Sequence, residues 1–393
     1  MKIAILNNLY APYQKGGAEL SVEMLARGLV RHGDDVSVVT LHESDRITQE
    51  ERDGVSVWRL PLRNIYWPFG DTKATQTERL RWHLSDIYNR TAARDINEVL
   101  SAISPDIVHT NNLSGFSVSA WKAAKHRKIP LVHTARDYYL LHPNSTLFTN
   151  GTIQNEAGFT ARAWSLVKKL RSSHVAHFVG ISQYVVDIHR RNGYFPTAST
   201  SVIFNSVEMP AAAPRSAFVA GTQPTYGYIG RLDPSKGLGV LLDAIRQFPT
   251  SRLLIAGSGN PEYVSHLKNS PPANVEFLGR KSPTDFFSMI DILIVPSTWA
   301  EPLGRVVLEA YAHGVPVVAS RIGGLADVVW EGETGVQFEL TSTHSSKSLS
   351  DGIKRIAAMD FPVMSRLCLK HAALFTIDAV SQSYQRVFQE LVE

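Results

Sequence analysis

Short apolar runs alternate with longer amphipathic stretches along this 393-residue chain, and that alternation restricts its possible folds more than any other feature. Apolar runs of this kind have the length of buried strands, and the stretches between them have apolar residues at helical spacing. In the N-terminal half, strands are predicted at residues 2–6, 36–40, 54–60, 107–110, 131–133 and 176–181, and helices at residues 20–32, 77–101, 117–126 and 161–173. Strands separated by helices form a mostly parallel sheet with both faces covered, so we predict a doubly wound α/β fold.

The same alternation begins again after residues 211–224, a stretch rich in Ala, Pro and Ser that is typical of a linker. One strand is predicted before this stretch, at residues 201–204, and further strands follow it at residues 225–229, 252–256, 275–278, 292–295 and 315–320. A chain of this length is expected to form about two domains. We place the first domain at residues 1–208 and the second at residues 209–375, followed by a helical C-terminal segment at residues 376–393.

Charge is shared unevenly between the halves, although the net charge is only +4. Residues 1–200 hold 24 Lys and Arg against 18 Asp and Glu, whereas the remainder holds 16 against 18. A basic half predicts an anionic partner. The chain has no dense basic run and no basic strand interleaved with aromatic residues, so we expect no nucleic acid and favour an anionic membrane surface or a phosphorylated acceptor.

Residues 161–173 leave two interpretations open. Leu166 and Leu170 share this predicted helix with Lys168 and Lys169. Such a basic amphipathic pattern suits a helix that rests on a membrane interface. It equally suits a helix that packs on the core and turns a charged back to solvent, and we slightly favour this second interpretation.

The single cysteine, Cys368, excludes a disulfide framework and a cysteine-rich metal site, and it fits a reducing cytosol. The N-terminal sequence is too short in its apolar part to predict a signal peptide. No run approaches the roughly 18 apolar residues that predict a membrane span.

Two carboxylates, Glu301 and Glu309, lie in the sequence PSTWAEPLGRVVLEAYAHGVP, whose apolar spacing predicts a helix over residues 305–313. Glu301 therefore precedes a helix N-terminus, where the backbone N–H groups of Leu303 and Gly304 favour an anion such as a phosphate. Two hydroxyl acceptors beside phosphate donors suit a nucleotide-sugar, in which a diphosphate joins two polyhydroxylated rings.

Two cations, Arg231 and Lys236, follow the predicted strand 225–229 in a loop that contains glycine. Arginine as a planar fork and lysine as a point charge both suit a diphosphate. Their spacing is not that of a P-loop, which argues against an ordinary ATPase. Gly257 and Arg280 follow two further strands, and the repetition of such residues at strand ends favours a ligand site over a purely structural domain.

The first half has its own glycine-bearing loop, with Gly16 and Gly17 between a strand and a helix. These glycines allow a ligand to approach the backbone closely. The loop lacks the G-x-G-x-x-G pattern, which argues against a dehydrogenase.

His109 and His133 lie at or near the ends of two predicted strands, where ligands of doubly wound sheets bind. A structural role and a ligand-contacting role are both open for each histidine. Arg136 and Asp137 follow in a polar, aromatic loop that is a candidate wall for an acceptor.

Together these motifs resemble those of glycosyltransferase family 4. Five segments resemble the donor-binding half of that family: GRLDPSKG, GSG, FLGR, PSTWAEPLGRVVLEAYAHGVPVVAS and IGGLADVV. Two segments resemble its acceptor half less specifically: KGGAE and HTARDYYLLHP. The resemblance covers nearly the whole chain. It implies the GT-B fold, in which two Rossmann-like domains face each other across a cleft, and it implies that segment 376–393 crosses back to the first domain.

The resemblance also implies roles for individual residues. Arg231 and Lys236 would bind the donor diphosphate, and Gly17 would close over the phosphates. Glu309 would bind the ribose, and Arg280 would lie beside the base. The donor sugar would be bound by Glu301 and by the backbone N–H groups of Leu303 and Gly304.

On the acceptor side, many relatives have a His-Asp pair. In this chain the pair corresponds to Arg136-Asp137, or else His133 is the counterpart of its histidine. We favour His133, at the strand end, as the residue near the reacting carbon. The residues predicted to act in catalysis are therefore His133, Glu301, Arg231 and Lys236.

The implied activity is that of a retaining, metal-independent hexosyltransferase. It would transfer a sugar from a UDP- or GDP-sugar to a glycan or lipid-linked acceptor, as in cell-surface polysaccharide or lipopolysaccharide synthesis. The nucleotide-sugar is a co-substrate, no cofactor is expected, and the expected location is the cytoplasm or the inner face of the cytoplasmic membrane. Three alternatives stay open: another sugar-processing enzyme of this fold, a non-catalytic sugar-nucleotide-binding protein, and a structural interaction protein.

Overall fold

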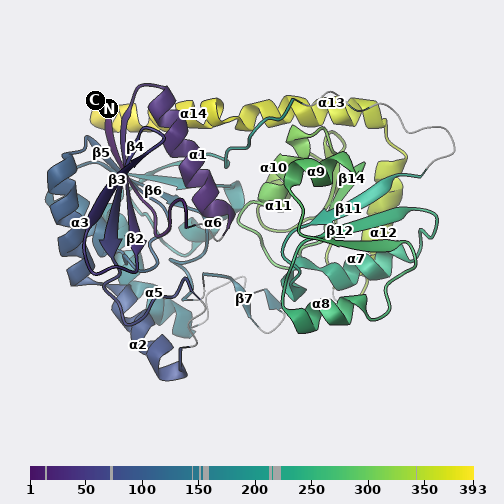
Figure 1. Cartoon of the computed structure of the whole chain (residues 1–393), viewed down its shortest axis with the longest axis horizontal. Helices are drawn as coiled ribbons and strands as arrows, with labels where there is room; N and C mark the ends of the chain where they lie inside the picture. The colour runs from purple at the N-terminus through teal and green to yellow at the C-terminus, as the bar shows by residue number, and fades with distance from the viewer. Residues whose placement is uncertain are drawn as a thin grey trace. The chain divides into compact units, whose positions relative to one another are not determined.

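The structure, a computed structural model, describes residues 1–13, 16–70, 74–143, 145–149, 152–153, 159–211, 215, 223–341 and 343–393. The chain divides into two compact units (Figure 1). The first unit comprises Met1–Leu147, Gln154–Ser206 and Ile377–Glu393, and the second comprises Phe148–Ile153 and Val207–Thr376. Lys15 and most of the predicted linker at 211–224 lie outside the described residues.

The first unit is built on a sheet with the strand order β10-β9-β6-β5-β1-β2-β4-β3. Neighbouring strands are parallel, except that β3 is antiparallel to β4. The strands are β1 Lys2–Leu6, β2 Asp35–His42, β3 Thr48–Arg52, β4 Val55–Pro61, β5 Ile107–Thr110, β6 Leu131–Ala135, β9 His177–Gly180 and β10 Ser199–Val202. The helices are α1 Gly17–Arg31, α2 Gln76–Ile87, α3 Arg90–Ile103, α4 Ser119–His126, α5 Phe159–Arg171, η1 Ser172–His174, α6 Gln183–Arg191 and α14 Ile377–Val392.

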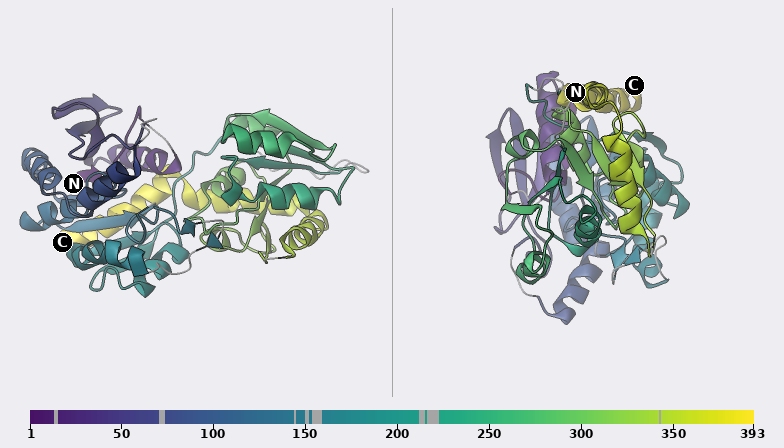
Figure 2. Two further views of the ribbon diagram at one scale, coloured as in Figure 1. Left: turned by 90° about the horizontal axis from the view of Figure 1, so that it is seen from below. Right: turned by 90° about the vertical axis from the view of Figure 1, so that its right-hand side faces the viewer.

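Helices cover both faces of this sheet (Figure 2). Helix α1 packs beside α14, and Leu25 and Val380 from these two helices join the apolar cluster around Ile5 of β1. On the other face, Trp121 of α4 contacts His133 of β6. The predicted parallel sheet with covered faces is therefore confirmed for this unit.

Two local predictions in the first unit were wrong. The helix predicted at 77–101 is two helices, α2 and α3, because Tyr88 is extended and the Asn89 side chain accepts a hydrogen bond from Ala92 N–H as a new N-cap. Strand β3 was missed because its sequence, TQEER, is polar and exposed throughout, as an edge strand can be.

The second unit has a six-stranded sheet, entirely parallel, in the order β13-β12-β11-β14-β15-β16. The strands are β11 Thr225–Ile229, β12 Arg252–Ala256, β13 Val275–Gly279, β14 Ile292–Val295, β15 Val317–Ser320 and β16 Gly335–Phe338. The helices are η2 Pro234–Lys236, α7 Leu238–Ile245, α8 Pro261–Lys268, α9 Pro283–Ser288, α10 Arg305–Ala312, α11 Leu325–Val328, α12 Ser345–Ala357, α13 Phe361–Ala372 and η3 Ala373–Phe375. A short hairpin, β7 Phe148–Thr149 with β8 Thr152–Ile153, is grouped with this unit.

Both sheets reverse their strand order at their first strand. Strand β1 lies between β5 and β2, and β11 lies between β12 and β14. In doubly wound sheets, ligands bind beyond the carboxyl ends of the strands at such a reversal, because the loops on either side diverge there. The loops after β1, β5, β11 and β14 are therefore where each unit is expected to hold a ligand. Among the described residues, no helix is long and apolar enough to cross a bilayer.

Candidate active site

The loops after β11, β12 and β13 are joined by backbone hydrogen bonds at the carboxyl edge of the second sheet. Gly230 N–H donates to Ala256 O at 3.1 Å, and Gly257 N–H donates to Gly279 O at 2.7 Å. Gly257 has φ +146°, and a Cβ placed there would lie 1.8 Å from Gly230 O. Only glycine fits this approach, so the contact between the two loops requires Gly257. Its contact with a ligand stays a prediction.

Lys236 and Glu301 come from the two loops that diverge at the strand reversal, and they meet. Lys236 Nζ donates to Glu301 Oε1 at 2.9 Å, and their side chains are 18% and 12% exposed. The Ser297 hydroxyl also donates to this carboxylate oxygen. Thr298 N–H donates to Ser235 O at 2.8 Å, which ties the two loops together. A largely buried ion pair thus stands at the position where a doubly wound sheet binds its ligand.

The predicted helix at 305–313 is α10, which begins at Arg305. Gly304 caps it in the left-handed region at φ +88°, and a Cβ there would lie 2.3 Å from Leu325 Cδ2. The Leu303 side chain is buried. Glu309 lies one turn into the helix, where Arg305 Nε donates to its Oε1 at 2.8 Å.

The two remaining predicted cations of this unit lie at the same edge. Arg231 follows β11, and Tyr228 donates a hydrogen bond to its carbonyl at 2.8 Å. Burial raises the pKa of Asp233, but hydrogen bonds from Ser235 and the charges of Arg231 and Lys236 lower that pKa overall. Arg280 Nε donates to Ser258 Oγ at 2.9 Å. The structure therefore brings the predicted donor-side residues of the second unit to one edge of its sheet, whereas Gly17 belongs to the first unit.

In the first unit, Arg136 is held by two asparagines that the sequence motifs did not single out. Arg136 Nε donates to Asn111 Oδ1 at 2.9 Å, and its Nη1 donates to Asn205 Oδ1. The arginine is buried and follows β6, whereas the asparagines follow β5 and β10. Both could have been found as polar residues directly after strands, the signal that was used for the second half.

Asp137 lies next to this arginine, and the Tyr139 N–H donates to its Oδ1 at 2.9 Å. Burial, with a smaller contribution from the charge of Glu19, raises the pKa of Asp137 to about 6. Glu19 belongs to the start of α1, where its Oε2 accepts from the N-cap Gly16 N–H at 2.9 Å, and Gly17 is the first helical residue. Glu19 thus holds the backbone of Gly16 and acts on Asp137 electrostatically.

His133 lies in the core of the first unit, where the structure does not support the predicted contact with a substrate. Strand β6 runs on to Ala135, so the histidine is inside the strand and is 2% exposed. Its ring packs against Trp121, Phe178 and Phe195, and its Nδ1 lies 2.9 Å from Thr110 Oγ1. The preference for His133 over Arg136-Asp137 must therefore be reversed.

His109 is likewise a core residue and not a wall of a ligand site. It is fully buried, its Nε2 lies 2.8 Å from Thr134 Oγ1, and that oxygen lies 3.0 Å from the Tyr384 hydroxyl. The ring also contacts Phe388 of α14. His109 thus connects the sheet to the C-terminal helix.

Replacing His133 by phenylalanine is expected to make the protein less sensitive to acid. Burial, together with the charge of His189, lowers the pKa of His133 to about 3. An unfolded histidine has a pKa near 6.5, so the folded state binds fewer protons and loses stability as the pH falls below that value. By about pH 4 this histidine alone would cost about 3 kcal/mol.

Unfolding free energy against pH, measured for the wild type and His133→Phe, tests this expectation. Thr110 keeps partners in the variant, because Trp121 Nε1 donates to its hydroxyl and that hydroxyl reaches Val132 O. The exposed His126, changed to glutamine, is the control and should leave the pH profile unchanged. Identical profiles for the wild type and His133→Phe would contradict the assignment of His133 as a neutral core residue.

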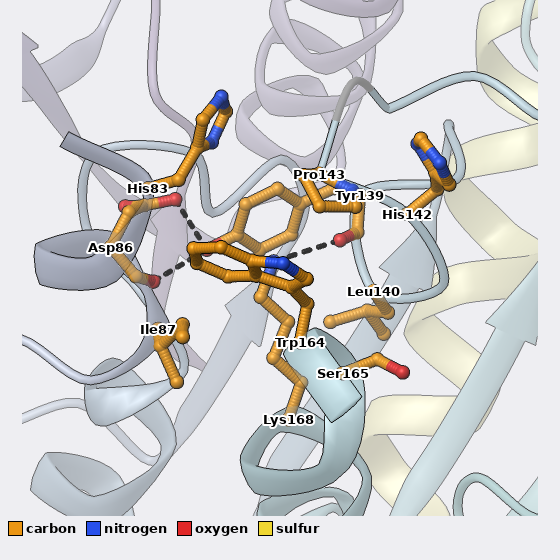
Figure 3. Close-up of a pocket in the computed structure, with 10 residues that line it drawn as sticks. All are labelled: His83, Asp86, Ile87, Tyr139, Leu140, His142, Pro143, Trp164, Ser165 and Lys168. Carbon is orange, nitrogen blue, oxygen red and sulfur yellow. Dashed lines mark hydrogen bonds between the residues drawn. The ribbon is translucent and has the colours of Figure 1, made fainter. Parts of the chain in front are cut away.

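A small cavity lies behind the Arg136-Asp137 loop, between α2 and α5 (Figure 3). The Tyr139 hydroxyl donates to Asp86 Oδ2 at 2.7 Å, and Lys168 Nζ donates to Tyr139 O at 2.9 Å. Burial raises the pKa of Asp86 and lowers that of Lys168. At roughly 10 Å³ the cavity has room for about one water molecule, so it is too small for a sugar.

Among the residues that the structure describes, no three His, Cys, Asp or Glu side chains lie together as metal ligands do. Cys368 is buried. The carboxylates at the second sheet edge are instead engaged by cations of the chain, Glu301 by Lys236 and Glu309 by Arg305.

Family models match both halves of the chain. Residues 212–366 match the family described as glycosyl transferases group 1, and residues 16–205 match the glycosyl transferase 4-like domain. An uncharacterized 42.6 kDa protein in the cps region of Klebsiella pneumoniae is 35% identical over 389 residues, covering 99% of this chain and all of that one.

Two solved structures show the same fold. Sucrose-phosphate synthase from Thermosynechococcus elongatus has a TM-score of 0.74 at 20% identity, covering 99% of this chain and 98% of that chain. Anabaena Alr3699/HepE in complex with UDP has a TM-score of 0.72 at 19% identity, with both chains covered completely. At these identities the likeness concerns the fold alone, and it confirms the predicted fold class of two Rossmann-like α/β units.

Proposed function

The chain belongs to the group 1 glycosyltransferases of the family 4 type, and on that premise we propose that it transfers a hexose from a UDP- or GDP-sugar to a glycan or lipid-linked acceptor. The observation that carries this proposal is the contact between Lys236 and Glu301 at the strand reversal of the second sheet. A cation beside a carboxylate at that position offers one group for the diphosphate and one for the sugar hydroxyls.

The donor diphosphate is assigned to Lys236 and Arg231. Both cations act on Asp233 electrostatically, so their charges converge on one part of the loop. Glu301 is assigned to the sugar hydroxyls and Glu309 to the ribose. Each carboxylate is paired with a cation of the chain, so we expect donor binding to replace part of these ion pairs with contacts to the substrate.

We propose a retaining reaction that requires no metal. The bond between the anomeric carbon and the diphosphate oxygen breaks, and its electron pair stays on the diphosphate, which gains negative charge. Lys236 and Arg231 stabilise that charge in place of a metal ion. The acceptor hydroxyl attacks from the same face, and its proton passes to an oxygen of the leaving phosphate.

On the acceptor side we assign Arg136 and Asp137 in place of His133. Arg136 is fixed by Asn111 and Asn205, and Asp137 is fixed by the Tyr139 N–H, so this loop holds charged groups in defined positions. Burial brings the pKa of Asp137 to about 6, which leaves its carboxylate able to accept a hydrogen bond from a hydroxyl at neutral pH.

We propose that the acceptor belongs to the synthesis of a cell-surface polysaccharide. The support is the full-length similarity to the Klebsiella protein in a cps region. We place the reaction in the cytoplasm, where the single buried thiol of Cys368 would stay reduced.

A thermal-shift panel of UDP, GDP, ADP and their sugars tests the donor assignment. A nucleotide-sugar present at about 100 times its dissociation constant should stabilise the folded protein by about 2.7 kcal/mol. For a unit of this size that corresponds to a rise in melting temperature of about 5–10 °C. The base that gives the larger shift identifies the donor, and no shift with any member of the panel would contradict the proposal.

The same panel distinguishes the alternative of a non-catalytic sugar-nucleotide-binding protein. Such a protein would be stabilised by the donor but would release no free nucleotide from it on long incubation. The proposed enzyme should show slow donor hydrolysis even without acceptor, because the same cations stabilise the leaving diphosphate whether water or a sugar attacks.

A further inference from the structure

Helix α5 buries one of its lysines. Lys168 is only 6% exposed, whereas Leu166 and Leu170, each two positions away, are 54% and 65% exposed. Residues two positions apart in a helix point to nearly opposite sides, so Lys168 faces the interior of the first unit. The core-facing helix with a charged back, which the sequence slightly favoured, is therefore wrong.

The buried ammonium of Lys168 is held by Tyr139 (Figure 3). Its Nζ donates to Tyr139 O at 2.9 Å and lies 3.4 Å from the centre of the Tyr139 ring. Two further hydrogen bonds fix the tyrosine, whose hydroxyl donates to Asp86 Oδ2 at 2.7 Å and whose N–H donates to Asp137 Oδ1 at 2.9 Å. One tyrosine thus connects a lysine of α5 and an aspartate of α2 to the carboxylate that we assign to the acceptor.

Asp86 is the carboxylate that accompanies the buried ammonium. It is 2% exposed, and Gly115 N–H donates to its Oδ1 at 2.7 Å. The charge of Lys168 lowers the pKa of Asp86, and the charge of Asp86 raises that of Lys168, although burial acts against both charged forms. Replacing a buried ion pair by apolar residues often costs no stability, so stability alone does not account for this pair.

The other titratable groups around Lys168 carry no charge at neutral pH or keep their protons. Burial, with smaller contributions from the charges of Lys168 and His142, lowers the pKa of His83 on α2, so its ring is neutral. Burial and the charge of Asp86 raise the pKa of Tyr139, so its hydroxyl keeps the proton that it donates. Neither group therefore offsets the positive charge of Lys168.

Two charges act on Asp137 in opposite directions. Glu19 of α1 raises the pKa of Asp137, and Lys168 lowers it. We propose that Lys168 is a positioning residue for Asp137. It holds the Arg136-Asp137 loop through Tyr139, and its buried charge stabilises the Asp137 carboxylate against the opposing charge of Glu19.

This inference deepens the proposed function and rests on it for one point, the assignment of Asp137 to the acceptor. An ionised carboxylate accepts hydrogen bonds and repels anions. At Asp137 the acceptor would therefore present a sugar hydroxyl and not a phosphate. Without the charge of Lys168 the carboxylate would take up a proton at a higher pH, and this recognition would be lost over part of the neutral range.

The titration of Asp137 can be followed without any substrate. The free energy of unfolding is measured against pH for the wild type and D137N, and the difference between them reports Asp137. The folded pKa of about 6 exceeds the unfolded value of about 4, so the stability of the wild type relative to D137N falls as the pH rises through this range, and the difference levels off above about pH 6. In the K168M background the same difference should level off about one pH unit higher.

Two variants separate the charge of Lys168 from its structural contribution. K169M removes an exposed lysine next to Lys168 in the same helix, and it should leave the levelling-off pH unchanged. D86N/K168M removes both buried charges, while the new amide oxygen still accepts from the Tyr139 hydroxyl and Gly115 N–H. It should regain part of the stability lost in K168M, because no charge is left alone in the interior, yet keep the raised levelling-off pH.

The proposal is overturned if the difference levels off at the same pH with and without Lys168. It is also overturned if D86N/K168M restores the wild-type levelling-off pH, because the shift in K168M would then come from a loosened structure. Nucleotide-induced thermal stabilisation, measured for every variant, tests the donor assignment separately. A protein that shows the coupling between Lys168 and Asp137 but binds no nucleotide would contradict the proposed function and leave this inference about Asp137 standing.

Discussion

Replacing Lys236 by methionine is expected to lower turnover by about 10²- to 10³-fold while the protein stays folded. Removal of one donor that stabilises a developing oxyanion has an effect of this size, because the charge forms in a site from which water is excluded. The side chain is also the cationic partner of Glu301 at 2.9 Å, so its loss leaves that carboxylate with the Ser297 hydroxyl. Methionine keeps most of the side-chain volume, so the loop after β11 should keep its conformation.

Single-turnover rates with a saturating donor separate the chemical step from donor binding. Lys354→Met is the matched control, because Lys354 is 60% exposed and pairs only with Asp351 one turn away in the same helix, among the pairs that the structure describes. It should leave turnover within about twofold of the wild type, as surface pairs contribute little. If Lys236→Met turned over as fast as the wild type, the assignment of this edge to the donor diphosphate would be wrong.

Replacing Gly257 by alanine is expected to destabilise the second unit by about 3 kcal/mol or more. Two destabilising effects add. The backbone φ at this position is +146°, where residues other than glycine are strained, and the new Cβ would lie 1.8 Å from Gly230 O. The loops after β11 and β12 must then separate, which also displaces Arg231. We expect the melting temperature to fall by about 6–12 °C and the nucleotide-induced shift to weaken.

Gly239→Ala is the control for this substitution. Gly239 is in the first turn of α7, is exposed, and would place a Cβ with no heavy atom within 4 Å. Alanine there should stabilise the protein by about 0.5 kcal/mol, because glycine loses more backbone entropy in a helix. Differential scanning calorimetry of both variants measures the contrast. Equal melting temperatures would mean that the close approach of Gly257 to Gly230 does not constrain the donor edge.

The donor side could be predicted from the sequence because its residues follow a local rule. Lys236, Glu301 and Gly257 each lie in the loop that follows an apolar strand, and parallel strands bring their carboxyl ends to one edge. Helix α10 was predicted to within one residue because its apolar spacing and its glycine boundaries are local signals. The contact between Lys236 and Glu301 follows from the reversal of strand order, which the strand spacing alone did not reveal.

The acceptor side was predicted less well because burial depends on distant residues. His133 follows an apolar run as the donor-side residues do, but β6 continues past it and Trp121, Phe178 and Phe195 close over its ring. The three aromatic residues come from other elements of the fold. A strand-end rule therefore selected a core histidine.

From the sequence by itself came the class of fold, the division into two parts and the set of charged and glycine residues at the second sheet edge. These depend on periodicity and on neighbours in the chain, which the sequence contains directly. Only the tertiary structure decided that Lys168 is buried while Leu166 and Leu170 are exposed. The same helix pattern fits either orientation, and the choice was made by Tyr139 and Asp86, which lie far from α5 in the chain and provide the buried ammonium with its partners.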